Sequence, residues 1–303
     1  MQVRRTWPVS LLLALALWQC PRPGIAAQPA APATLDKGWH HCRNCIQRGD
    51  FTGAHETLKE LGIDVALGFT TVWQSNHRGG LRSRPEGKLA TSWDIEAALD
   101  TEELGFWPGG LFVAHLEGSD GTGIDERYVG SFFGTDGDAD STGGHDLQFS
   151  EYFYEHTFGG GLLSLRLGKM DATRDLDTNA YANDECCQFL NGAFVNNPTV
   201  PFPDYALGVL AIVRPVEGFY LAATALDAEA EGCKSGRDTL LGGDPQWFLA
   251  AEAGVEVALP AGEKALPGTY RVGLWRDPLN YERLDNGREE SSEWGLYARG
   301  PRG

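Results

Sequence analysis

Ten stretches of this chain read as β-strands, and the connections between them alternate between long and short along the sequence. The connections hold about 17, 8, 27, 5, 34, 3, 19, 10 and 17 residues. A transmembrane barrel carries short turns at one rim and longer loops at the other, so the alternation favours an all-β, antiparallel transmembrane β-barrel. The expected strands are Gly62–Gln74, Ser92–Thr101, Gly110–Ser119, Leu147–His156, Leu162–Lys169, Asp204–Arg214, Gly218–Leu226, Gln246–Val257, Gly268–Trp275 and Glu293–Ala298.

Polar and apolar side chains also alternate along single strands, as a sheet with one wet and one lipid-facing side requires. In the second strand the apolar side holds Trp93, Ile95, Ala97 and Leu99, and the other side holds Ser92, Asp94, Glu96, Ala98 and Asp100. The first and fifth strands repeat the pattern. Tyr205–Val213 and Phe219–Leu226 are apolar or small on both faces, which would suit a buried sheet equally well.

The N-terminal residues predict an export signal. Arg4 and Arg5 precede the apolar run Leu11–Trp18, and the small-residue region Pro23–Ala27 follows, so we expect cleavage after Ala27. The apolar run is too short for a spanning helix, and no later stretch approaches the roughly 18 apolar residues that one needs. The expected organisation is a signal peptide at 1–27, a periplasmic segment at 28–61 and one barrel domain at 62–303.

The chain is acidic, with a formal net charge of −17. This charge argues against a nucleic-acid partner, because phosphate binding needs clustered Lys and Arg. The composition fits an outer-membrane barrel and a secreted β-domain equally well. The alternative prediction is therefore a secreted or surface-attached β-sandwich that binds carbohydrate.

Five cysteines remain after the expected cleavage, in a compartment that should be oxidising. Cys42 and Cys45 are spaced for a small disulfide, although they could instead stay as free thiols or, together with His40 and His41, present four metal ligands. Cys186 and Cys187 share one long loop, and one of them could pair with a cysteine in the next. The disulfide candidates are Cys42, Cys45, Cys187 and Cys233.

The connection from Met170 to Pro203 is the richest in polar side chains. A loop of this length in a compact domain is usually functional or disordered. Its amides, carboxylates and aromatic ring can hydrogen-bond to and stack on a polyhydroxyl solute, although a solvated surface loop remains the competing interpretation. In general porins the third outward loop folds into the lumen, and this connection is third in the count. The candidate residues are Asp171, Arg174, Asp177, Asn179, Tyr181 and Asn183, with Asp94, Glu96 and Arg166 on the polar strand faces.

Other motifs are weaker. Asp136, Asp138 and Asp140 form a D-x-D-x-D run, but the glycine and glutamate of an EF-hand calcium loop are absent, which favours a solvated acidic loop. Asp94 and Glu96 could in principle serve a glycosidase, but acids at i and i+2 on a strand commonly arise by chance. No catalytic triad, phosphate-binding glycine loop or zinc-binding helix stands out. We therefore expect no enzymatic activity, no cofactor and no resident metal.

Several motifs that follow one another along most of the expected mature chain resemble the carbohydrate-selective porin family. They are GFTTVWQSN at 68–76, SWDIEAALD at 92–100, LGFWPGG at 104–110, LGKMD at 167–171, DTNAYAN at 177–183, FLNG at 189–192, NNP at 196–198, PFPDY at 201–205 and PGTYRVGLW at 267–275.

The resemblance implies a sixteen-stranded barrel in the outer membrane of a Gram-negative type of cell, surrounded by lipid, with a homotrimer as one allowed assembly. It implies passive diffusion of sugars through the lumen, without catalysis, through contacts that each stay weak enough for the solute to leave. It also implies that the stretch Lys169–Pro203 shapes the constriction. The positions that it carries over are Arg166, Lys169, Asp171, Asp177, Asn179 and Asn183.

The C-terminus departs from this pattern. A sixteen-stranded member should continue well beyond Trp275 and end in a strand that closes with an aromatic residue. This sequence instead ends with ARGPRG at 298–303. We therefore expect an incomplete, C-terminally truncated barrel of about ten strands, whose last residues are unlike the family.

Overall fold

The computed structural model describes residues 54–135, 145–179, 182–183, 188–232, 234–240, 245–261 and 264–300. Its strands are β1 (Ile63–Asn76), β2 (Glu86–Asp100), β3 (Gly110–Gly121), β4 (His145–Phe158), β5 (Leu163–Met170), β6 (Ala206–Val216), β7 (Phe219–Asp227), β8 (Trp247–Ala261), β9 (Lys264–Glu282) and β10 (Glu289–Arg299). The short helical segments are α1 (Ala54–Glu60), η4 (Asp125–Val129), η5 (Ala172–Arg174), η6 (Gly192–Phe194) and α2 (Arg237–Leu240). Among the helices of these residues, none has the length and apolar character to cross a membrane.

Several predicted features lie outside the described residues. They are the export signal, the D-x-D-x-D run, Tyr181, and the disulfide candidates Cys42, Cys45, Cys187 and Cys233.

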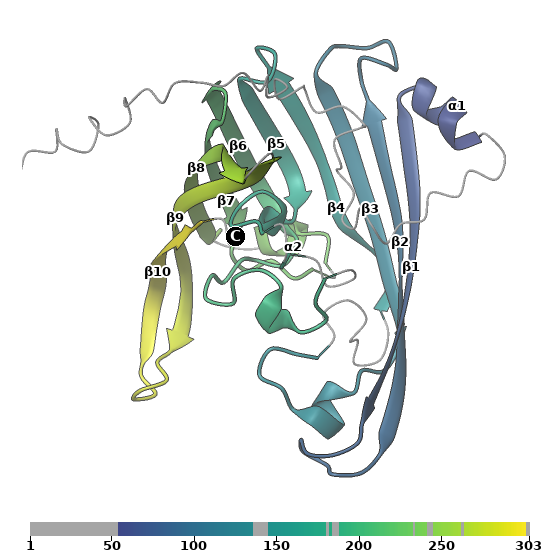
Figure 1. Ribbon diagram of the computed structural model, residues 1–303, viewed down its shortest axis with the longest axis vertical. Coiled ribbons are helices and arrows are strands. Elements are labelled where there is room, and N and C mark those ends of the chain that lie inside the picture. Colours follow the sequence, from purple (N-terminus) through teal and green to yellow (C-terminus); the bar gives the residue numbers. More distant parts are fainter. Residues whose placement is uncertain are drawn as a thin grey trace, which may run out of the picture.

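All ten strands belong to one sheet, in which each strand runs antiparallel to the next and the order follows the chain from β1 to β10. In Figure 1 the sheet forms a curved wall, with the helical segments η5 and η6 on its concave side and β1 and β10 at its two edges. Across the described strands, β1 and β10 do not pair, so the sheet is open. This arrangement confirms the predicted all-β antiparallel class, and it shows that the alternative of a two-sheet sandwich is wrong.

Each of the ten predicted strands is present, but several connections differ from the expected lengths. The connection after β1 spans only 77–85, because Glu86–Thr91 continue β2 and pair with Thr71–Asn76. It is therefore no longer than the turn at 101–109, and the alternation of long and short fails at this end. β9 and β10 are also longer than predicted, since residues 277–282 of β9 extend the pairing beyond the predicted end at Trp275.

The predicted division of the strand faces is confirmed where the pattern was clearest. In β2, Ser92, Glu96, Ala98 and Asp100 are buried, whereas Leu99 is exposed. In β1 the buried Asp64 and Ala66 alternate with the exposed Leu67 and Phe69. The sheet therefore has an inner face that buries charge and an outer face that exposes large apolar side chains.

The hydrophobic core lies between the inner face of the later strands and the segment that joins β5 to β6. Leu176 and Val200 of that segment are buried with Leu210 of β6, Leu226 of β7 and Phe248 of β8. Burying one such side chain contributes about 1.5–3 kcal/mol. Apolar packing therefore helps to hold this connection against the sheet.

Gly168 provides a test of how tightly β5 fits its neighbours. Its φ is +139°, and a Cβ built there would lie 2.3 Å from the Tyr152 carbonyl oxygen of β4. We expect Gly168→Ala to lower the free energy of unfolding by at least about 2 kcal/mol, through backbone strain and overpacking together. Urea unfolding followed by tryptophan fluorescence measures the change.

The matched control is Gly105→Ala, where φ is +79° and nothing lies within 4 Å of the added Cβ. This control carries the backbone strain alone, so its cost should be about 1 kcal/mol. Equal losses in the two variants would show that the contact with Tyr152 imposes no constraint.

Candidate functional site

Strands β2 to β5 bury several charged or titratable side chains, and five of them form the centre of the inner face. Glu96, His115, Glu151, Glu155 and Arg166 are each at most 9 % exposed. A charge removed from water is stable only where a partner or hydrogen bonds compensate the lost hydration. The partners come from neighbouring strands and from the segment between β5 and β6.

Arg166 of β5 forms ion pairs with two carboxylates. Its Nε lies 2.9 Å from Glu155 Oε2 on β4, and its Nη1 lies 2.6 Å from Asp175 Oδ2, just after η5. The guanidinium carbon is also 4.6 Å from the centroid of the Phe153 ring, within the range of a cation–π contact. Arg166 therefore ties the β5–β6 connection to the sheet.

A second attachment forms at Glu151 of β4. Its Oε1 accepts the backbone N–H of Asp171 at 2.9 Å, and its Oε2 pairs with Arg174. Asp171 in turn caps η5, because its Oδ1 accepts the N–H of Thr173 at 2.8 Å. The predicted residues Asp171 and Arg174 thus lie against the inner face, where they are fixed by a carboxylate that the sequence did not single out.

A third attachment lies at the other end of the sheet. Asp177 donates its N–H to Glu252 Oε2 of β8 at 2.8 Å, and its Oδ1 lies 3.1 Å from Nε of Arg299 on β10. The hydroxyls of Tyr220 and Tyr297 also donate to Glu252, at 2.5 and 2.8 Å. Asp177 has a φ of +52°, a conformation that is uncommon outside glycine. The contacts on both sides of its backbone offset that strain.

Lys169, Asn179 and Asn183 make contacts of other kinds. Lys169 is fully buried, and its Nζ donates to the carbonyl oxygens of Phe149, Gly232 and Lys234 at 2.8, 2.6 and 2.7 Å. Asn183 Oδ1 accepts the N–H of Asn179 at 3.2 Å. Lys169 therefore ties the β7–β8 connection to the sheet, and the two asparagines bond to each other within segment 170–203.

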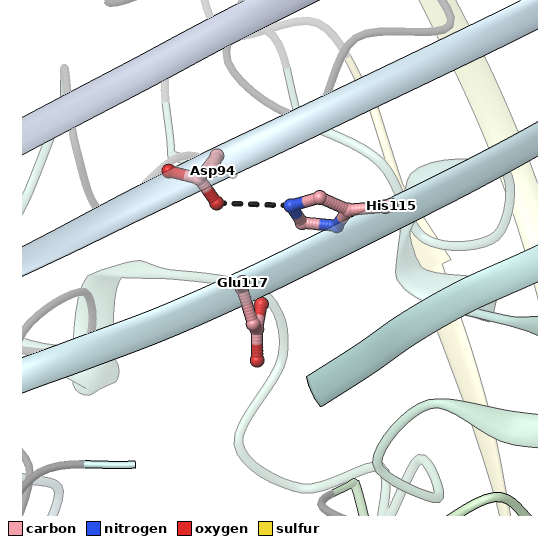
Figure 2. Close-up of side chains that lie close together, drawn as sticks. All are labelled: Asp94, His115 and Glu117. Atoms are coloured by element: carbon pink, nitrogen blue, oxygen red, sulfur yellow. Dashed lines mark hydrogen bonds and ion pairs between the residues drawn. The ribbon is translucent and has the colours of Figure 1, made fainter. Parts of the chain in front are cut away.

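Asp94 has a partner of a different kind. Figure 2 shows Asp94 on β2 beside His115 and Glu117 of β3, with Asp94 Oδ1 2.9 Å from His115 Nε2. One ligand atom from each of these three side chains lies within 4.8 Å of the others. Glu117 also accepts hydrogen bonds from Gln148 Nε2 at 2.7 Å and from the Tyr205 hydroxyl at 3.2 Å.

Sequence reasoning missed Glu151 and Glu252, the two carboxylates that accept hydrogen bonds from the β5–β6 connection. A register shift opposite His115 and Leu116 leaves Ser150 between the paired residues Phe149 and Glu151, and both Ser150 and Glu151 are fully buried. A strict alternation through β4 would instead place Phe149 and Glu151 on one face. The visible signal is that Glu151 and Glu155 are acids within an otherwise aromatic strand.

Comparison with known proteins agrees with this geometry. The sequence model of the carbohydrate-selective porin family, OprB, matches residues 86–298. The chain belongs to that family. The match includes β2 to β9 and nearly all of β10, with the whole β5–β6 connection.

A solved structure of OprB from Pseudomonas putida at high pH has the same fold, with a TM-score of 0.67 and 16 % sequence identity. The alignment covers 84 % of this chain and 65 % of that one, so the chain spans about two thirds of the OprB structure. An uncharacterized protein of Aquifex aeolicus (strain VF5) is 51 % identical over 54 residues, which is 18 % of each chain.

Arg166 offers a direct test of the buried ion pairs. We expect Arg166→Met to destabilise the fold by about 3–5 kcal/mol, because Glu155 and Asp175 would stay buried without their cation. Arg283→Met is the control, since Arg283 also pairs with two carboxylates but on an exposed hairpin. Equal unfolding midpoints in urea for Arg166→Met and the parent would contradict the assigned role.

Asp204 gives a prediction for pH dependence. Partial loss of hydration, and then the negative charges of Glu117 and Asp171, raise the pKa of the Asp204 carboxyl above its ordinary value of 3.8. The unfolded chain therefore ionises at lower pH than the folded one, and this carboxyl costs stability as the pH rises above about 4.

Asp204→Asn should remove that cost. We expect the variant to be more stable than the parent at pH 7, and the gain to disappear below about pH 4, where the carboxyl is protonated in both states. Urea unfolding across this range measures the difference. A constant difference at every pH would contradict the assigned cause.

Proposed function

We propose that this chain builds an outer-membrane channel for the passive, selective diffusion of carbohydrates, and that segment 170–203 narrows its lumen. The observation that carries the proposal is the division of the wall into an apolar outer face and a charged inner face. Membership of the carbohydrate-selective porin family supports the same function.

The outer face has the chemistry of a lipid-facing surface. Leu67 and Phe69 of β1 are 66 and 72 % exposed, and Leu89 of β2, Phe112 of β3 and Leu296 of β10 are also exposed. Apolar side chains that continue across neighbouring strands are costly in water and are favourable in a bilayer. This face supports a location in the outer membrane, with the expected signal at 1–27 directing export.

Segment 170–203 is suited to narrowing a channel because it is attached to the inner face at two places, one at β4 and β5 and the other at β8 and β10. Arg174 and Asp175 contact β4 and β5, whereas Asp177 contacts β8 and β10. Leu176 alone separates Asp175 from Asp177 along the chain, and η5, just before them, lies on the concave side of the sheet (Figure 1). A segment held in this way would keep the channel opening at a fixed width and present fixed charges to a passing solute.

The chemistry of the segment fits weak contacts with sugars. Carboxylates, amides and guanidinium groups hydrogen-bond to hydroxyls, and rings such as that of Tyr181 stack on the apolar faces of pyranoses. Solute must also leave again, so each contact should be weak, and small ions should pass with the sugar. The proposal includes no catalytic step. A homotrimer is the assembly that we propose for the complete channel.

The first experiment asks whether the protein conducts sugar. The full chain is extracted from outer membranes with detergent and reconstituted into liposomes, and swelling is followed in isotonic glucose and in an isotonic larger oligosaccharide. We expect glucose to enter faster than the oligosaccharide. Swelling no faster than that of protein-free liposomes would contradict a channel made by this chain.

The second experiment asks whether the segment lies in the ion path. We expect Arg174→Gln to shift the reversal potential toward cation selectivity in planar bilayers, because a positive charge leaves the inner face while Glu151 stays. Arg78→Gln removes the same charge from the exposed connection after β1 and serves as the control. Equal reversal potentials in parent and Arg174→Gln would place the segment away from the path.

A further inference from the structure

The side chains of Asp94, His115 and Glu117 form a group that the proposed channel function does not require. One ligand atom of each lies within 4.8 Å of the others, and His115 is 1 % exposed. The three side chains come from two neighbouring strands and point to one side of them (Figure 2). Rigid strands hold ligands more precisely than loops do.

The register of the two strands makes this group unusual. Asp94 and Glu117 are direct cross-strand partners, and His115 pairs with Glu96. Like charges directly opposite each other on adjacent strands destabilise a sheet. A divalent cation between the two carboxylates would turn that repulsion into attraction, since their two negative charges match its charge.

The surroundings resemble the outer shell of a metal site. A histidine that binds a metal through one ring nitrogen usually directs the other toward a carboxylate or carbonyl. His115 directs Nε2 toward Asp94, and its Nδ1 lies 4.0 Å from Glu151 Oε2. Glu117 is oriented by hydrogen bonds from Gln148 and Tyr205. His115 and Glu117, the two candidate ligands on β3, thus both have neighbours that could fix their orientation.

The local charge also favours a cation. Glu117 and Asp171 are close enough to Asp204 to help raise the pKa of its carboxyl, after the larger effect of burial. Glu117 and Asp171 thus add to the negative charge around Asp204, and Lys169 acts there in the opposite direction. The nearby Arg174 pairs with Glu151, on the far side of the imidazole ring.

We propose that Asp94, His115 and Glu117 bind one divalent transition-metal cation of the Zn²⁺ class. Imidazole nitrogen with carboxylate oxygen suits Zn²⁺, whereas Ca²⁺ and Mg²⁺ prefer oxygen ligands throughout. Ligand atoms about 2.0–2.2 Å from the ion require the three side chains to close by about 1 Å or less. His115 gives up the Nε2 contact with Asp94 in this state, and water completes the coordination.

The test titrates Zn²⁺ alone into the full chain in detergent and measures binding by calorimetry. His40→Ala, His41→Ala, Cys42→Ser and Cys45→Ser are introduced together beforehand, so that the N-terminal His and Cys cluster cannot contribute. We expect one equivalent of Zn²⁺ to bind. His115→Gln and Glu117→Gln should each weaken binding at least about tenfold.

His156→Gln is the matched control, because His156 lies on the neighbouring strand β4 with its Nδ1 bonded to the Tyr154 hydroxyl. It should leave the affinity unchanged. The visible absorption of bound Co²⁺ gives a second readout, which should disappear in His115→Gln. If that variant does not fold, as judged by heat-modifiable mobility on a denaturing gel, Glu117→Gln decides.

Two results would overturn the proposal. One is the absence of Zn²⁺ binding to the folded parent, and the other is an affinity in Glu117→Gln equal to that of the parent. Neither result depends on transport, because no sugar and no channel current is measured. A protein that binds no Zn²⁺ but still takes up glucose would refute the metal site and leave the channel intact.

Discussion

Buried charge on the inner face is the constraint on which the rest of this structure depends. Arg166 and Glu151 are nearly or fully removed from water, and neither would be stable there alone. The segment after β5 supplies Asp175 to the first and Arg174 to the second. Folding of the sheet and placement of the segment are therefore coupled, because each provides the counter-charges that the other requires.

The alternation of residues predicted much of the fold because a period of two can be read without knowing any partner. It succeeded in β2, where Glu96 and Ala98 are buried and Leu99 is exposed, and each predicted strand is present. It failed at the β9–β10 hairpin, where β9 continues to Glu282 although only Leu279 and Tyr281 alternate there as apolar residues after Pro278. So short a run does not predict a strand by itself, and here strand structure also follows from pairing with β10.

The site was less predictable, because its contacts join residues far apart in the chain. Asp94, Arg166 and Asp177 could be selected by type and position, but Glu252 and Arg299 could not be assigned to Asp177 before the register was known. The shift at Ser150 has a similar effect, since one unpaired residue changes which side chains of β4 face inward. The strand register, and not the composition, determines which carboxylate forms an ion pair with which cation.

The strength of these attachments has a consequence for how a channel of this kind would select. A loop that moved freely could adapt to a solute and bind it tightly, which would slow its release. Asp177 is instead held in a left-handed backbone conformation by Glu252 on one side and Arg299 on the other. Charges that stay in place when the solute arrives need no reorganisation, so selection would rest on the width and the charge pattern of a rigid opening. The buried ion pairs would already hold the segment in place, so solute binding would not have to supply the free energy of ordering it.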